Sequence, residues 1–74
     1  MIETYFLYTP DGVLAGICGT QKDAMDSAVE TAKHYGICEV EQIYITAEKS
    51  SRKRIRVNAD GSFEKLWQKV EGVS

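Results

Sequence analysis

The sequence predicts an α+β fold in which a four-stranded antiparallel sheet carries one long and one short helix, in the order ββαββα. Three observations lead to this prediction. Three short stretches are rich in apolar, β-branched and aromatic residues, and a fourth alternates basic residues with Ile55 and Val57. Two other stretches place apolar residues at helical spacing, and glycine-containing or polar turn sequences separate the elements. With 74 residues the chain has room for one domain, which we assign to residues 1–74.

The beginning of the chain is typical of a β-hairpin. Residues 2–8 are rich in aromatic and β-branched side chains, and residues 13–18 are again mostly apolar. Between them, residues 9–12 read Thr-Pro-Asp-Gly, which suits a tight turn, because proline presets φ and glycine accepts a positive φ. The two stretches are therefore expected to pair as antiparallel strands.

A long helix is predicted over residues 21–35. Thr20 is a suitable N-cap, and Asp23, three residues later, completes a capping box. Gly36 suits the left-handed position that follows the last turn. Small and apolar side chains recur on one face of this helix, at Ala24, Ala28, Thr31, Ala32 and Tyr35. This face is therefore expected to pack closely on a sheet.

The second half of the chain predicts another hairpin and a short helix. Residues 37–47 indicate a third strand, whose alternation slips near Gln42 and suggests a bulge or a twist. Residues 52–58 indicate a fourth strand. Beyond them, apolar residues follow the i, i+3, i+4, i+7 spacing of a helix, at Phe63, Leu66, Trp67 and Val70. We expect a short amphipathic helix there, capped by Asp60 or Ser62, and a frayed tail over residues 72–74.

The strand order follows from the path of the long helix. If this helix crosses the sheet and brings the third strand beside the first, the order 2-1-3-4 lets every neighbouring pair run antiparallel. The strand of residues 2–8 then lies inside the sheet, and the strand of residues 52–58 lies at an edge.

Charge is distributed unevenly along the chain. Residues 1–48 contain eight acidic and two basic residues, whereas residues 49–74 contain seven basic and three acidic ones. Five bases fall in one run, at Lys49, Arg52, Lys53, Arg54 and Arg56. Basic residues on an edge strand can serve only to prevent wrong strand pairing. Alternatively, they bind an acidic partner, with Arg54 and Arg56 on the same side of the strand and Lys49 and Lys53 adding to their field.

Nucleic acid is one such acidic partner. Arginines two residues apart on a strand lie roughly 7 Å apart, close to the spacing of neighbouring phosphates. The pI near 5.3 and the acidic first 48 residues argue against it, because affinity for nucleic acid comes from neutralising phosphates. An acidic protein surface, including that of a second copy of the chain, is therefore favoured over nucleic acid.

Apolar surface also favours contact with a protein. The predicted helices are too small to cover both sides of the sheet, and we expect Tyr5, Leu7, Val13 and Ile17 to face away from the long helix. Exposed apolar patches mark partner sites. Trp67 is either a core anchor or, on so short a helix, a residue that docks on a partner.

Residue types that carry catalysis are sparse. His34, the single histidine, lies in the last turn of the long helix, where a cation interacts favourably with the helix dipole. Cys18 and Cys38 are interpreted as core thiols. Cys18 also precedes the helix N-terminus, so a thiol-dependent enzyme is a remote alternative. The cysteine and histidine spacing does not match a zinc site, and no glycine-rich phosphate loop occurs. We therefore expect no catalytic residue, metal, cofactor or small-molecule substrate.

These observations favour a small non-enzymatic module, an accessory or regulatory protein that binds another protein or a second copy of itself. No stretch approaches the roughly 20 apolar residues of a membrane-spanning helix, and the N-terminus lacks the basic segment of a secretory signal. We expect a cytoplasmic protein without membrane contact. The expected partner-binding residues are Lys49, Arg52, Lys53, Arg54, Arg56, Tyr5, Leu7 and Trp67.

Overall fold

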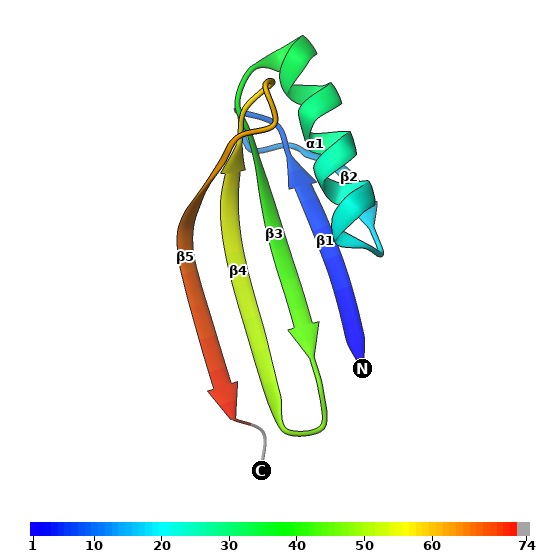
Figure 1. The fold of residues 1–74 in the computed structure, drawn as a ribbon, viewed down its shortest axis with the longest axis vertical. Coiled ribbons are helices and arrows are strands. Elements are labelled where there is room, and N and C mark those ends of the chain that lie inside the picture. Colours follow the sequence, from blue (N-terminus) through cyan, green and yellow to red (C-terminus); the bar gives the residue numbers. More distant parts are fainter. Residues whose placement is uncertain (73–74) are drawn as a thin grey trace.

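The computed structural model of the chain describes residues 1–72, which form a five-stranded antiparallel sheet and one helix (Figure 1). The elements are β1 (Ile2–Tyr8), β2 (Leu14–Cys18), α1 (Gln21–Tyr35), β3 (Cys38–Ile45), β4 (Lys49–Val57) and β5 (Phe63–Gly72). The strand order is β2-β1-β3-β4-β5. The α+β class is therefore confirmed, and so is the order of the first four strands, but the sheet has a fifth strand in place of the second helix.

Turn and capping residues set the boundaries of the first hairpin and of α1. Gly12 has φ 88° and donates its N–H to the Thr9 carbonyl at 2.9 Å, which closes the turn between β1 and β2. The Thr20 hydroxyl accepts a hydrogen bond from the Asp23 N–H at 3.2 Å, and this N-cap starts α1. Gly36 ends the helix with φ 97°. These three predictions are confirmed.

The predicted second helix is wrong, because residues 63–72 pair along the whole of β4 as strand β5. A tight turn returns the chain, with Gly61 at φ 89° and the Asn58 N–H donating to the Ser62 carbonyl at 2.9 Å. The Asp60 carboxylate, expected to cap a helix, accepts from the Ser62 N–H inside this turn. A register shift beside Arg54 breaks the alternation of β5, so its apolar residues fall at helix-like spacing.

Strand β5 changes the position of the basic run. Because β4 pairs with β3 on one side and with β5 on the other, it lies inside the sheet, and the predicted edge position is wrong. Protection of an edge therefore does not explain the arginines of β4. Gly72, expected to fray, pairs with Lys49 at the end of β5, whereas residues 73–74 lie outside the described residues.

The core lies between α1 and one face of the sheet. The small helix residues Ala24, Ala28 and Ala32 are buried, as predicted, against strand residues that are themselves 9% exposed or less. These strand residues are Tyr5, Leu7, Cys38, Val40, Ile55 and Val57. The expectation that Tyr5 and Leu7 face away from the helix is therefore wrong. Both sides of β1 are apolar, and α1 packs on the side that carries Tyr5 and Leu7.

Strand β3 is regular. Its pairing with β1 and β4 runs from Cys38 to Ile45 without a register shift, so the bulge considered near Gln42 is absent from this strand. Its pattern looks irregular because glutamates occupy one face of the strand and Gln42 the other. Within residues 1–72, no helix is long and apolar enough to cross a membrane.

Candidate functional site

The candidate site is the face of the sheet opposite α1, which we call the open face. Side chains of a strand alternate between the two faces, and the pairing register aligns them across the sheet. Four rows of the open face result. They are Leu14, Tyr8, Glu39, Arg56 and Glu64; Ile17, Phe6, Glu41, Arg54 and Trp67; Thr4, Ile43, Arg52 and Lys69; and Ile2, Ile45, Ser50 and Glu71. In the described part of the chain, α1 packs on the other side.

Glutamates of β3 and arginines of β4 form an ion ladder in the middle of the open face, made of Glu39, Glu41, Arg52, Arg54 and Arg56. Arg52 Nη2 lies 2.9 Å from Glu41 Oε1, and Arg54 Nε lies 2.8 Å from Glu39 Oε1. These two ion pairs are diagonal across β3 and β4. The residue directly opposite Glu41 is Arg54, whereas its ion-pair partner is Arg52. The Glu41 side chain is only 9% exposed, so its pairing with Arg52 satisfies a charge that is almost removed from solvent.

The Arg54 guanidinium is held from two sides. Its Nε donates to Glu39, and its central carbon lies 4.6 Å from the centre of the Tyr8 ring, which is a cation–π contact. Arg56 is bound more loosely, since its closest acidic partner, Glu64, is 3.9 Å away and its side chain is 45% exposed. The ladder is therefore fixed at Arg54 and free to accept further partners at Arg56.

Exposed apolar side chains lie beside the ladder, mainly on β1 and β2. Ile2 is 53% exposed, Ile17 63% and Trp67 40%. Leu14 and Ile45 are exposed as well. These large apolar groups share one face of the sheet, which α1 does not cover. The open face thus combines a charged ladder with exposed apolar side chains beside it, and β5 contributes Trp67 together with charged residues.

The residues expected to bind a partner divide between the two faces. Arg52, Arg54, Arg56 and Trp67 meet on the open face. Lys49 and Lys53 lie on the side that carries α1, and Tyr5 and Leu7 are in the core there. Sequence reasoning missed Ile2, Phe6, Tyr8, Glu39, Glu41, Ile43 and Ile45. The twofold alternation within each strand could have indicated these residues. No single stretch of the sequence, however, determines the register that aligns one strand with the next.

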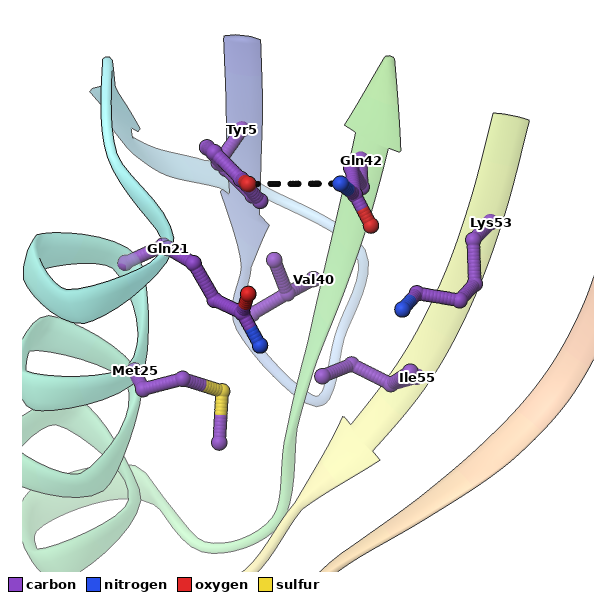
Figure 2. Close-up of a pocket in the computed structure, with 8 residues that line it drawn as sticks. Tyr5, Gln21, Met25, Val40, Gln42, Lys53 and Ile55 are labelled. Carbon is purple, nitrogen blue, oxygen red and sulfur yellow. Dashed lines mark hydrogen bonds between the residues drawn. The ribbon is translucent and has the colours of Figure 1, made fainter. Parts of the chain in front are cut away.

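Lys53 instead reaches a small recess beside the N-terminus of α1 (Figure 2). Gln42 Nε2 donates to the Tyr5 hydroxyl oxygen at 3.2 Å, and that hydroxyl donates to Glu3. Burial, together with the Glu3 carboxylate, raises the pKa of Tyr5 to about 12. The hollow has a volume of about 20 Å³, which is room for one water molecule. It is therefore too small for a metabolite.

The cysteine thiols and His34 make contacts that are typical of structural residues. Cys38 is fully buried, and burial raises the pKa of its thiol, so the reactive thiolate is disfavoured. Cys18 is half-buried, with its sulfur 4.0 Å from the Ser27 hydroxyl. His34 Nε2 lies 3.6 Å from a Glu30 carboxylate oxygen one helical turn away. Among residues 1–72, no three His, Cys, Asp or Glu side chains gather in a way that could hold a metal ion.

Comparisons of the chain with protein-family models, with curated proteins and with solved structures find no significant match. The function is therefore argued from the open face itself.

Proposed function

We propose that the protein is a small cytoplasmic interaction module without a catalytic role, which binds another protein through its open face as an accessory or regulatory subunit. The exposed apolar side chains of the open face are the observation that carries this proposal. Ile2, Ile17 and Trp67 would each lose unfavourable contact with water on burial against a partner. The free thiols of Cys18 and Cys38 are compatible with a reducing compartment.

The shape of the site supports a broad partner surface over a small ligand. The open face spans all five strands of the sheet formed by residues 1–72. Its ordered ladder, with Arg54 held by Glu39 and Tyr8, needs little rearrangement before binding. A second folded protein fits such a preformed surface.

The charge of the open face favours a protein over nucleic acid. Its four basic residues, Arg52, Arg54, Arg56 and Lys69, share the face with four acidic ones, Glu39, Glu41, Glu64 and Glu71. A face that is neutral overall gives little counterion release on a phosphate backbone. Nucleic acid therefore stays the less favoured alternative, and a negligible affinity for DNA and RNA at low salt is expected.

The test compares two aromatic positions of β5. Trp67 lies on the open face, and Phe63, opposite Val57, lies on the other side of the same strand. Tagged wild-type protein, Trp67→Arg and Phe63→Arg are used to capture bound proteins from the source cell, which are quantified by mass spectrometry, with circular dichroism as the folding control. We expect Trp67→Arg to lose a bound protein that wild type and Phe63→Arg retain. Identical captures by the two variants would contradict binding through the open face.

A further inference from the structure

The open face is complementary to itself about one particular axis, and we infer that its partner is a second copy of this chain. The two copies stack their open faces about a twofold axis that runs parallel to the strands, between β3 and β4. This inference rests on the proposed function and names the partner of the same site. Closed twofold dimers are the commonest soluble oligomers, and such an interface uses the same patch of both copies.

The charges of the ladder select this axis. Rotation about a line between β3 and β4 places β3 of one copy over β4 of the other, so Glu39 faces Arg56 and Glu41 faces Arg54 across the interface. An axis along β3 would instead bring Glu39 over Glu39. An axis along β4 would bring arginine over arginine. An axis between β1 and β3 would place Glu41 over Phe6. Among these strand-parallel axes, the one between β3 and β4 therefore pairs opposite charges.

The same rotation matches the strands that flank the ladder. It places β1 of one copy over β5 of the other, because each lies one strand further from the axis. Phe6 and Trp67 share a row with Glu41 and Arg54, so these two aromatic side chains meet across the interface. One row further, Ile43 lies over the apolar stem of Arg52. Aromatic contacts thus flank the charged centre, whereas β2, with Ile17, lies outside the four strands that face each other.

The intrachain pairs leave capacity for interchain ones. Arg56 is 45% exposed with its nearest carboxylate oxygen at 3.9 Å, so its guanidinium has donors to offer. Glu39 uses Oε1 for Arg54 and is 36% exposed, so it can accept a second guanidinium. Facing sheets pack about 10 Å apart, a distance that long side chains from both copies bridge. Glu39, Glu41, Arg54 and Arg56 then each have two partners of opposite charge, which offsets their desolvation, and Arg52 keeps Glu41.

The area is sufficient for reversible association. Four strands at about 4.8 Å spacing and rows about 6.7 Å apart give on the order of 500 Å² of flat sheet per copy, before the relief of the side chains is counted. This is below the roughly 600–1,000 Å² per partner of standard specific interfaces, in the range of weak, transient complexes. We therefore expect a dimer with a micromolar dissociation constant rather than a permanent one.

The first experiment measures self-association of the purified protein by sedimentation equilibrium, from about 1 to about 500 µM. Wild type is expected to dimerise, more weakly when NaCl is raised from about 50 to about 500 mM, because salt screens the interchain pairs. Trp67→Ala should weaken the dimer at least about tenfold, whereas Phe63→Ala should leave it unchanged. A monomer throughout, or a dimer equally stable in both variants, would overturn the inference.

A charge exchange in trans tests the axis itself. Arg56→Glu places two glutamates against each other at both symmetry-related contacts of its own dimer, and Glu39→Arg does the same with arginines. Mixing the two variants restores Glu–Arg pairs at both contacts, so the mixture should dimerise while neither variant does alone. A mixture that stays monomeric would contradict this axis. If the purified protein is monomeric and yet captures another protein through Trp67, the inference fails while the proposed function stands.

Discussion

The two faces of the sheet are made by the same strands and have opposite chemistry. Under α1, the row through Leu7, Val40 and Ile55 is apolar and buried. One residue along each strand, on the open face, the row contains Glu41 and Arg54. The helix closes the first face with alanines, so that face stabilises the fold. The second face carries the ion ladder, whose glutamates and arginines pair between β3 and β4. Alternation thus lets one set of strands build a buried apolar face and an exposed charged face.

Removing a side chain from each face gives the largest expected contrast. Leu7→Ala leaves a cavity at a position that is 3% exposed, and we expect it to lower the free energy of unfolding by about 2–5 kcal/mol. Ile17→Ala removes an open-face side chain that is 63% exposed, and should change stability by no more than about 0.5 kcal/mol. Urea denaturation of both variants measures the difference. Equal losses would show that the open face also belongs to the core.

Alkaline pH should weaken the covered face through Tyr5. Its folded pKa is raised to about 12 from 10.0, so the neutral phenol is favoured in the fold. The contribution to stability is complete below pH 10 and is lost as pH rises towards 12, by about 2–3 kcal/mol.

Denaturation of wild type and of Tyr5→Phe at about pH 9 and about pH 11.5 isolates this group, since all other titrations are shared by the two proteins. Wild type should lose more stability than Tyr5→Phe over that interval. The same loss in both proteins would assign the alkaline weakening to other residues.

The smallest effect concerns the ladder. Arg52→Ala leaves the Glu41 carboxylate, which is 9% exposed, without its partner, and we expect a loss of about 1–2 kcal/mol. Lys22→Ala breaks an ion pair of similar length, 2.8 Å, whose side chains are 84% and 67% exposed, and should leave the stability almost unchanged because solvent screens the pair. Chemical denaturation compares them. If Arg52→Ala is as mild as Lys22→Ala, the ladder contributes nothing to stability.

Local signals predicted most of the fold. Thr20, Gly36 and the alanine stripe defined α1 within the chain, and the hairpins followed from alternation between turn residues. Strand β5 was missed because a bulge near Trp67 imitates helical spacing, and only pairing with β4 distinguishes the two. The arginines of the site were found from charge. Their partners Glu39 and Glu41 were not, because the register between β3 and β4 is a tertiary property.

Strand β5 has a further consequence for how such a protein changes over generations. Among residues 1–72, it packs against β4 and against no other element, yet it supplies Trp67, Lys69 and Glu71 to the open face. Substitutions on its outer positions can therefore change the chemistry of the open face while the core under α1 keeps its packing. Under the proposed function, binding specificity can then evolve faster than the fold.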